Sequence, residues 1–205
     1  MKVLISGFEP FDGMQFNPSQ ALMSSLKSEE FSFELETIVL PVSFNSCFEI
    51  LKLKMNEFKP DIIIGTGLAS SRREITIERI AINTIEARIA DNDGNQPVQN
   101  YILEESSDGL FSQLPIHAMV LNGLKDNLPV AISNTAGTYV CNYLMYMIVN
   151  YAKNYNLKGG FIHLPPSKEI NQDGLEMTLI TKAVAKMLKA IEGPELTNVQ
   201  LGRED

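Results

Sequence analysis

The sequence predicts a single α/β domain in three layers, with helices on both sides of a mainly parallel central sheet. Two observations lead to this prediction. Apolar runs of strand length alternate with segments of helical spacing, an order typical of layered α/β domains. Several of these runs are almost continuously apolar, as expected of strands that are buried on both faces. A length of 205 residues fits one domain, because a single core serves chains of up to roughly 250 residues.

Six apolar runs are predicted as strands, at residues 2–6, 37–42, 61–67, 117–122, 130–134 and 159–165. A further segment, residues 74–83, places isoleucines in a period close to two. This period slips in phase around Glu78 and Arg79, which indicates a strand or a hairpin with an irregularity. The following stretch is rich in Asn, Asp, Gly and Pro and is therefore predicted to be a loop.

Four segments of helical spacing lie among these runs, at residues 18–27, 43–58, 138–154 and 175–191. The first begins after Asn17, a suitable N-cap, with Pro18 at its first position. In the second, Cys47 falls on an apolar face with Phe48 and Leu51, so we expect this cysteine to be buried. The domain is predicted to cover residues 1–192, and the polar, acidic stretch 193–205 is predicted to be a loose tail.

Charge and composition exclude several classes of function. The net charge of −8 argues against a nucleic-acid partner, since phosphate binding needs a basic surface. The amino end reaches Gly, Glu and Pro too early for a signal peptide, and the longest apolar run is shorter than the ~20 residues of a membrane span. We therefore expect a cytoplasmic protein without a membrane partner. The two cysteines are no disulfide framework and form no zinc motif.

Two glycine-containing runs resemble binding motifs only in part. Gly65 and Gly67 follow a predicted strand, but position 70 is Ser and a second strand pattern follows, so the dinucleotide fingerprint is incomplete. In the run DNDGN, Gly94 is out of place, and Ile102 stands where a calcium loop needs a bidentate Glu. Both runs are interpreted as loops, and no cofactor or metal is expected.

Cys141 is a candidate nucleophile. It lies in the run SNTAGTYVCN, at the start of a predicted helix, where free N–H groups and the helix dipole lower the pKa of a thiol. A strand–turn–helix junction also exposes a side chain to a cleft at the carboxyl edge of a parallel sheet. The alternative is an inert buried thiol, because cysteine is among the most buried residue types.

A thiolate nucleophile needs a base, and the chain has two histidines. His163 ends a predicted strand before Leu-Pro-Pro, at the edge where the turn before Cys141 is expected to open. His117 precedes its predicted strand and is expected on the surface of the opposite edge. A Cys and a His at one edge fit nucleophilic catalysis, and a carboxylate would orient the imidazole. Spacing leaves the choice of carboxylate open among Glu9, Glu74, Glu78, Asp91 and Asp93.

Four motifs together carry a family resemblance. GFEPFDGMQFNPS, GLASSRREITIERIAIN, SNTAGTYVCN and FIHLP occur in this order and resemble the pyrrolidone-carboxyl peptidases (pyroglutamyl-peptidase I), a family of cysteine peptidases. The resemblance covers the whole chain before the tail. It implies removal of N-terminal pyroglutamyl residues from peptides by a triad of Cys141, His163 and Glu78. Other thiol amidases acting on small amides, and an inactive binding member of the same fold, stay open as alternatives.

The resemblance also implies a binding pocket and an assembly. Phe8 and Phe11 would sandwich the lactam ring, and Asn17 would contact its amide. The backbone N–H of Cys141 is expected to stabilise the oxyanion. Further candidates from the resemblance are Leu68, Ile89 and Val140 for the pocket and Arg88 as a second oxyanion donor. Family members are commonly homo-oligomers, so a dimer or tetramer is expected.

Three positions depart from the pattern of this family. Asp12 stands where Gly is usual, Tyr139 replaces a common Phe beside the nucleophile, and Gln99 replaces a usual Asp. None of these residues belongs to the implied triad. Asp12 and Tyr139 border the expected ring pocket, so the departures concern affinity more than the type of reaction.

Overall fold

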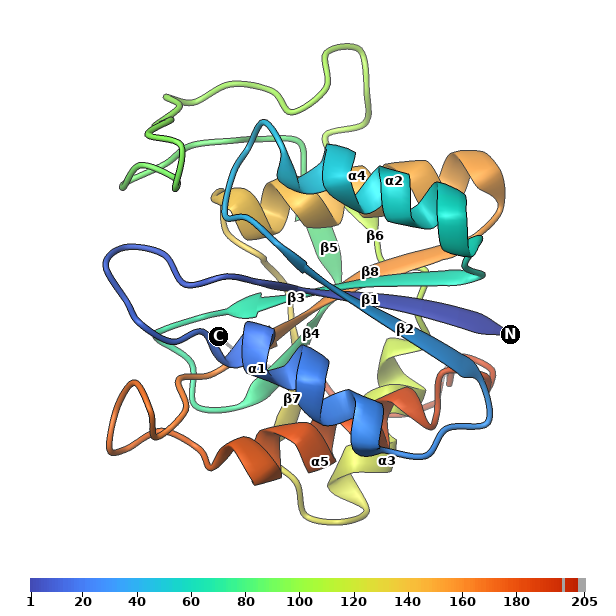
Figure 1. Ribbon diagram of the computed structural model, residues 1–205. Coiled ribbons are helices and arrows are strands. Elements are labelled where there is room, and N and C mark those ends of the chain that lie inside the picture. Colours follow the sequence, from blue (N-terminus) through green and yellow to red (C-terminus); the bar gives the residue numbers. More distant parts are fainter. Residues whose placement is uncertain (197, 203–205) are drawn as a thin grey trace.

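The computed structural model describes residues 1–196 and 198–202. Its centre is a six-stranded sheet whose strands lie in the order β2-β1-β3-β8-β4-β7 (Figure 1). Their bounds are β1 Lys2–Phe8, β2 Glu34–Leu40, β3 Ile62–Leu68, β4 Ile75–Glu78, β7 Val130–Ser133 and β8 Lys158–Leu164. A separate two-stranded sheet consists of β5 (Ile80–Ile82) and β6 (Gly109–Phe111).

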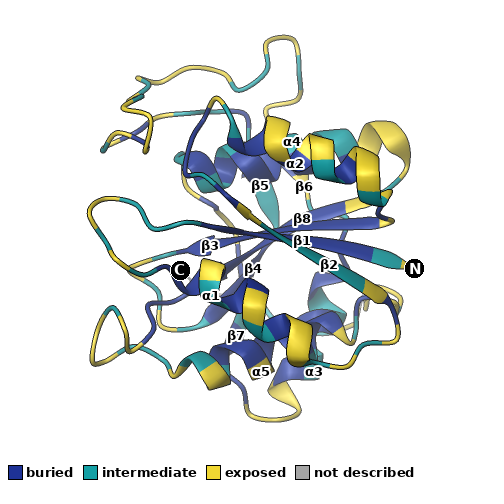
Figure 2. Ribbon diagram, in the orientation of Figure 1, coloured by how far each residue is buried: buried dark blue, intermediate teal, exposed yellow. Residues whose placement is uncertain are grey.

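Helices cover both faces of the central sheet, which confirms the predicted three-layer α/β domain. Their bounds are α1 Pro18–Ser25, α2 Cys47–Phe58, α3 Ile116–Leu124, α4 Val140–Tyr155 and α5 Met177–Leu188, with a short 3-10 turn at Leu26–Ser28. One apolar core joins the sheet to α1, α3 and α5. A second core joins the opposite face to α2 and α4. Figure 2 shows the buried strands between helices whose outer surfaces are exposed.

Asn17 caps α1 as predicted. Its side-chain oxygen accepts a hydrogen bond from the backbone N–H of Ser19 at 3.0 Å, and Pro18 is the first helical residue. Cys47 is fully buried on the apolar side of α2, also as predicted. However, α2 begins at Cys47 itself, so this cysteine is the first residue of the helix, whereas the predicted helix begins at Ser43.

The predicted strand at residues 117–122 is wrong, because this segment belongs to α3. Its buried residues, Ile116, Met119, Val120 and Gly123, follow the i, i+3, i+4, i+7 spacing of an amphipathic helix. A short apolar run fits both a buried strand and a buried helix, and its length did not discriminate between them. His117 therefore lies half-buried in the first turn of a helix, and it does not precede a strand.

The sheet is mainly parallel, but its last two strands run in the opposite direction. β1, β2, β3 and β8 are mutually parallel, whereas β4 pairs antiparallel with β8 and parallel with β7. The carboxyl ends of β7 and β8 therefore do not share an edge, and the edge argument used to bring Cys141 near His163 is wrong. Both β4 and β7 are only four residues long, and β4 pairs with the carboxyl-terminal half of β8.

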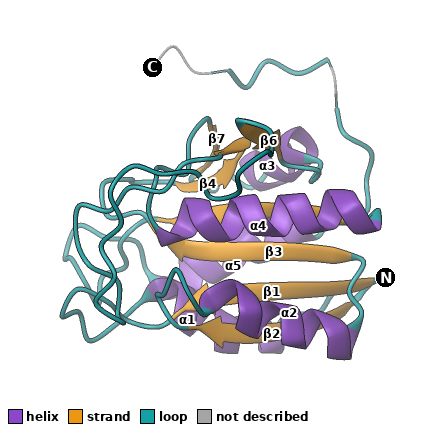
Figure 3. Cartoon of the chain, turned by 90° about the horizontal axis from the view of Figure 1, so that it is seen from above, coloured by secondary structure: helices purple, strands orange, loops and turns teal. Residues whose placement is uncertain are grey.

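The phase slip at Glu78 and Arg79 marks the change from one sheet to the other. β4 ends at Glu78 in the central sheet, and β5 starts at Ile80 in the small sheet. The chain from residue 83 to residue 108 then forms a long excursion on the side of α2 and α4 (Figure 1). Figure 3 shows that loops gather at the carboxyl ends of β1 and β3.

The boundary at residue 192 stays a prediction, and residues 197 and 203–205 of the predicted tail lie outside the described residues. Within the described part, a carboxylate oxygen of Glu195 accepts hydrogen bonds from the backbone N–H groups of His117 and Leu196. Leu201 packs against the core on the side of α5. Among the described residues, no helix is long and apolar enough to cross a membrane.

Candidate active site

The alternation of side chains along each strand gathers the predicted catalytic residues on the face that α4 covers. On β8, Ile162 packs in the core beneath α5, whereas Phe161 packs in the core beneath α4. His163 shares the face of Phe161, and their ring centroids are 4.8 Å apart. On β4, Ile77 belongs to the core beneath α5, so Glu78 points to the same face as His163.

Glu78 and His163 are in direct contact. Thr76 of β4 pairs with His163 of β8 in the antiparallel register. Glu78 lies two residues after Thr76 and therefore points to the same face of the sheet. Nδ1 of His163 lies 2.7 Å from Oε1 of Glu78, and both side chains are buried. Burial raises the pKa of Glu78, but the hydrogen bond and charge of His163 and the charge of Arg72 lower it below its ordinary value. The carboxylate is therefore ionised at neutral pH, and it leaves Nε2 of the imidazole available for chemistry.

The thiol of Cys141 lies against the strand beside β8. Cys141 is the second residue of α4, and Gly67 of β3 pairs in register with His163. A Cβ atom on Gly67 would lie 2.7 Å from Sγ of Cys141 and 3.2 Å from the ring of Phe161. Position 67 therefore has no room for a side chain. The missing Cβ lets the thiol rest on the sheet surface, one strand over from the imidazole.

The expectation that the helix start lowers the pKa of Cys141 is not met. Burial, followed by the charge of Glu78, raises this pKa to about 12, although the charge of Arg72 opposes them. Desolvation disfavours the charged form of a thiol and here outweighs the helix dipole. In the free protein the thiol is therefore protonated at neutral pH, and nucleophilic attack requires a base that removes this proton.

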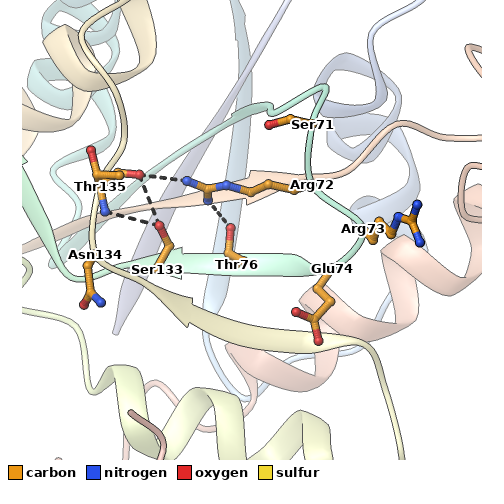
Figure 4. A pocket seen from close by; sticks show the side chains of 8 residues that line it. All are labelled: Ser71, Arg72, Arg73, Glu74, Thr76, Ser133, Asn134 and Thr135. Carbon is orange, nitrogen blue, oxygen red and sulfur yellow. Dashed lines mark hydrogen bonds between the residues drawn. The ribbon is translucent and has the colours of Figure 1, made fainter. Parts of the chain in front are cut away.

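No pattern in the sequence indicates a role for Arg72. Its guanidinium donates hydrogen bonds to Oε1 of Glu78, to the hydroxyl of Thr76 and, at 2.7 Å, to the carbonyl of Thr135. Figure 4 shows the side chain reaching from its loop across β4 to the segment after β7. In the run SSRRE, spacing did not distinguish Arg72 from the exposed Arg73. Only the tertiary fold makes that distinction.

A surface pocket of about 520 Å³ opens beside these hydrogen bonds (Figure 4). Its lining residues come from the loop before β4, from β4 itself and from the end of β7: Ser71, Arg72, Arg73, Glu74, Thr76, Ser133, Asn134 and Thr135. Thr76 and Arg72 are thus shared between this pocket and the surroundings of Glu78. The pocket brings solvent close to a carboxylate that is itself fully buried.

Asn142, next to the thiol, is a second residue whose role the sequence did not indicate. Its fully buried side chain accepts a hydrogen bond from the N–H of Ile82 at 3.0 Å and donates to the carbonyls of Ile82 and Thr84 at 2.9 and 3.0 Å. These bonds anchor β5 to the first turn of α4. In the Cys-Asn pair of the motif, the candidate nucleophile is therefore followed by a residue with a structural role.

Phe8, Phe11 and Asn17 lie at the carboxyl end of β1 and in the loop that follows. Phe8 is buried in the core beneath α4, and Phe11 packs against that core while half-exposed. The amide nitrogen of Asn17 donates to the carbonyl of Glu9 at 3.0 Å, and its oxygen accepts from both Ser19 N–H and Ser19 Oγ. In the free protein, the Asn17 amide is thus occupied in holding the turn that precedes α1.

The other predicted pocket residues surround the start of α4. Val140 is fully buried and Leu68 is buried at the end of β3. Ile89 is half-buried and Arg88 is exposed. The segment of Arg88 and Ile89 is bound to the turn before α4 by three hydrogen bonds, one of which runs from the hydroxyl of Thr138 to the carbonyl of Glu86 at 2.9 Å. Glu86 N–H donates to the carbonyl of Thr138 at 3.0 Å, and the phenol of Tyr139 donates to the carbonyl of Ala90 at 2.9 Å.

The three departures from the family pattern have distinct surroundings. Asp12 has a positive φ of 52°, a backbone conformation in which glycine is favoured. Tyr139 lies with its ring centroid 6.2 Å from that of Phe11 and 5.5 Å from that of Phe44. Gln99 is exposed on the long excursion. Asp91, one of the five carboxylates that spacing leaves open for the triad, accepts hydrogen bonds from the backbone N–H groups of Phe44, Asp93 and Asn95.

A thiol at a helix start, an imidazole and a carboxylate on one face of an α/β sheet are the groups with which cysteine hydrolases act. The comparisons with known proteins agree with this class. Residues 1–194 match the family model described as pyroglutamyl peptidase. The chain therefore belongs to the pyroglutamyl peptidase family, as the motifs indicated.

Relatives of known name cover nearly the whole chain. A pyrrolidone-carboxylate peptidase of Brachyspira hyodysenteriae is 42% identical over 201 residues, covering 97% of this chain and 100% of the relative. The crystal structure of Bacillus amyloliquefaciens pyroglutamyl peptidase I has a TM-score of 0.89 at 37% identity and covers 95% of this chain and 98% of that one. The pyrrolidone carboxyl peptidase of Thermococcus litoralis has a TM-score of 0.87 at 36% identity, with coverages of 93% and 92%.

Proposed function

We propose that this chain hydrolyses the bond after an N-terminal pyroglutamyl residue, with Cys141 as nucleophile, His163 as general base and acid, and Glu78 as the group that orients His163. The observation that carries the proposal is the packing of one thiol and one imidazole–carboxylate pair on the same sheet face. The 2.7 Å contact between Glu78 and His163 and the close approach of Sγ to Gly67 support these roles. Family membership supports the choice of substrate.

In the first half of the reaction, His163 Nε2 takes the proton of the Cys141 thiol. Since burial keeps this thiol protonated in the free protein, proton transfer and attack on the acyl carbon occur together once substrate excludes water. The negative charge of Glu78 stabilises the imidazolium that forms. The imidazolium then protonates the leaving amine, the C–N bond breaks, and the pyroglutamyl group stays on Cys141 as a thioester.

In the second half, a water molecule takes the place of the released peptide. His163 removes one proton from this water, and the resulting hydroxide attacks the thioester carbon. The C–S bond breaks, and the proton returns from His163 to the sulfur of Cys141. Free pyroglutamate leaves, so one water is consumed for each peptide bond cleaved, and the enzyme regains its starting protonation state.

The oxyanion is proposed to bind at the first turn of α4. The backbone N–H of Cys141 belongs to the group of N–H donors that an α-helix leaves unpaired at its start. Arg88 remains the second candidate. It is exposed in the free protein, but its segment is bound to Thr138 and Tyr139 beside the thiol. A loss of kcat in Arg88→Gln, without a change in stability, is the outcome that supports this role.

The lactam pocket is proposed to lie between the loop after β1 and the start of α4. Phe11, Val140 and Ile89 would supply apolar walls, and the backbone at Leu68 would bond the ring amide. Phe8 lies deeper in the core and would support the wall from behind. Asn17 would contact the lactam through its amide while it holds the turn at Glu9. A neutral lactam suits such walls, whereas the ammonium of an open-chain residue would be buried without a partner.

The test is a comparison of matched substrates. Pyroglutamyl arylamide is expected to be cleaved, and glutaminyl and glutamyl arylamides almost not at all, because their ammonium groups cannot be solvated by apolar walls. Comparable rates on all three would contradict the pyroglutamyl specificity and favour a broader thiol amidase. No turnover of any of them, by a chain that binds pyroglutamyl peptides, would favour an inactive binding member of the fold.

The same family membership supports a cytoplasmic protein that assembles from two or four identical subunits. Large apolar side chains are exposed on the excursion and on β6, including Val98, Tyr101 and Phe111. Exposed large apolar side chains such as these are available for contacts between subunits. Light scattering after gel filtration tests the assembly, and a monomer at micromolar concentration would contradict it.

A further inference from the structure

Arg72 joins three separate parts of the candidate site. Through one nitrogen it contacts the carboxylate of Glu78 and the hydroxyl of Thr76, both on β4. Through the other terminal nitrogen it donates to the carbonyl of Thr135 at 2.7 Å. Thr135 lies in the segment that connects β7 to the start of α4, six residues before Cys141. One guanidinium therefore links the carboxylate of the triad to the segment that leads to the nucleophile.

The ionised form of Glu78 depends on the guanidinium of Arg72 as well as on the contact with His163. The same oxygen, Oε1, accepts from both Arg72 and His163. The second oxygen, Oε2, is buried without a well-formed hydrogen bond among the described residues, although the hydroxyl of Ser133 also helps to lower the pKa of Glu78. A fully buried carboxylate is costly to keep ionised unless charges and donors compensate it. Within the described chain, Arg72 is the permanent cation in contact with Glu78.

We propose that Arg72 is a positioning residue of the reaction, which keeps Glu78 ionised and aimed at His163 and which reduces the repulsion between Glu78 and the thiolate of Cys141. The hydrogen bond from Arg72 to Thr135 holds the segment that leads to Cys141 at a fixed distance from Glu78. This inference rests on the proposed function of the triad. Arg72 lies outside the triad, and its positive charge allows the buried carboxylate of Glu78 and the thiolate of Cys141 to be present close together.

The charges around the site determine the direction of the expected effect. Glu78 raises the pKa of Cys141 and Arg72 lowers it, so removing Arg72 disfavours the thiolate. The same removal leaves the buried carboxylate of Glu78 less compensated. Two further arginines lie nearby, but Arg79 is bound through Nε to Asn134, and Arg73 is exposed. The pKa of Cys141 therefore moves upward when Arg72 is lost, and the pH profile of activity moves to higher pH.

The experiment compares Arg72→Met with Arg73→Met, because both changes remove one positive charge from neighbouring positions. Arg73 is exposed, and its side chain points away from Thr76 and Thr135 in Figure 4. For Arg72→Met we expect kcat on pyroglutamyl arylamide to fall about tenfold to hundredfold. This loss is smaller than the full contribution of general acid–base catalysis, because His163 itself is still present. KM should change little. The profile of kcat/KM against pH should move upward by roughly half a pH unit or more.

A second readout does not need the substrate. The pH dependence of Cys141 alkylation by iodoacetamide, followed by peptide mapping, should move upward in Arg72→Met and stay in place in Arg73→Met. If the wild-type chain does not cleave the pyroglutamyl substrate, the proposed function fails, while this alkylation profile still tests the role of Arg72. An alkylation profile that does not move in Arg72→Met would overturn the inference.

Arg72→Lys separates the charge of the guanidinium from its geometry. Lysine keeps the positive charge but cannot hold three acceptors in a fixed plane. We expect the pH profile of Arg72→Lys to return close to that of the wild type, with kcat only partly restored. A profile displaced as far as that of Arg72→Met would mean that Arg72 merely braces the segment at Thr135. If Arg72→Met does not fold, as judged by circular dichroism, Arg72→Gln provides the same neutral comparison.

Discussion

Two cysteines occupy similar places in this molecule, and their difference shows what makes a thiol a candidate nucleophile. Cys47 is the first residue of α2 and Cys141 the second residue of α4. Both helices cover the same face of the sheet, and both thiols belong to the same core region. Burial raises the pKa of both thiols above the ordinary value. A helix start is therefore not sufficient to activate either of them.

The surroundings of the two thiols are what differ. Phe44, Phe48 and Leu51 belong to the same apolar core as Cys47, and its side chain is fully buried. Cys141 keeps partial exposure and lies on the sheet beside the position of His163. The buried pair of Glu78 and His163 gives that region a base. Cys141 is therefore the better candidate nucleophile because of the side chains that the sheet presents to the start of α4, and not because of the helix itself.

Exchanging each cysteine gives the largest expected difference. Cys141→Ala should lower kcat/KM on pyroglutamyl arylamide about 10⁴-fold or more, as removal of a nucleophile does in other hydrolases. Cys47→Ala should keep activity close to that of the wild type and lower the free energy of unfolding by about 1 kcal/mol, since a small buried group is lost. Activity assays and urea unfolding measure both effects. Inactivation by iodoacetamide that tracks labelling of Cys47 would reverse the assignment.

The two histidines extend the comparison to the base. His163→Ala should lower kcat about 10²-fold to 10⁴-fold, the usual contribution of general acid–base catalysis. His117→Ala should leave kcat unchanged and cost less than about 1 kcal/mol of stability, because its contact with Glu195 at 2.9 Å is partly exposed. Steady-state kinetics with circular dichroism as a folding control separates them. Equal losses of kcat in both folded variants would contradict the role of His163.

The sequence predicted the layered fold and the four helices at residues 18–27, 43–58, 138–154 and 175–191 because their periodicities are strong. It failed at α3, where a short apolar run was compatible with both a strand and a helix. It also missed the reversal of β4 and β7, since strand direction depends on pairing partners far away in the chain. The sequence predicts a surface position for His117 because it is expected to precede a strand, whereas this residue lies half-buried in the first turn of α3.

The site was predictable to a different degree. The residues alone supported a pairing of Cys141 with His163, but five carboxylates remained open, and only the family resemblance selected Glu78. The structure supports that choice through a register that spacing cannot provide, with Thr76 opposite His163. The role of Arg72 could not be predicted from the sequence for the same reason. Its hydrogen-bond partners are determined by the way in which its loop crosses β4.

Two glycines on β3 sharpen the question of how the thiol is placed. A Cβ on Gly67 would meet Sγ of Cys141 at 2.7 Å, whereas a Cβ on Gly65 would meet the ring of Phe161 at 2.4 Å. Both Gly→Ala changes should therefore cost about 1–3 kcal/mol of stability by overpacking. Only Gly67→Ala displaces the thiol directly, and a displacement near 1 Å should lower kcat about tenfold to hundredfold.

The measurement is kcat per folded molecule, with unfolding curves for both variants. Gly65→Ala is the matched control, since it lies two residues earlier on the same strand and the same face. A similar fall in kcat for both variants would mean that the ring of Phe161, which lies beside His163, and not the thiol, transmits the effect. Unchanged kcat in Gly67→Ala would contradict the placement of Sγ on this strand.

The smallest expected effect concerns Tyr139, where the regions of the two cysteines meet. Tyr139 precedes α4, and its ring packs edge-on against Phe44, which precedes α2. Burial, followed by the charges of Asp91 and Cys141, raises the pKa of Tyr139 to about 12. The phenol therefore stays protonated, and it donates to the carbonyl of Ala90 at 2.9 Å. This bond holds the segment that carries Ile89, and a phenylalanine at position 139 could not form it.

Tyr139→Phe removes this bond and keeps the ring contacts with Phe11 and Phe44. The free energy of unfolding should fall by about 1 kcal/mol, the usual net contribution of one hydrogen bond. KM should rise slightly, because the segment at Ile89 is less firmly held, and kcat should stay at the wild-type level, because no triad contact changes. Urea unfolding and steady-state kinetics on pyroglutamyl arylamide measure these effects. A tenfold loss of kcat would show that the hydroxyl acts on the Cys141 region itself. The features that distinguish Cys141 from Cys47 would then include Tyr139, the residue before α4.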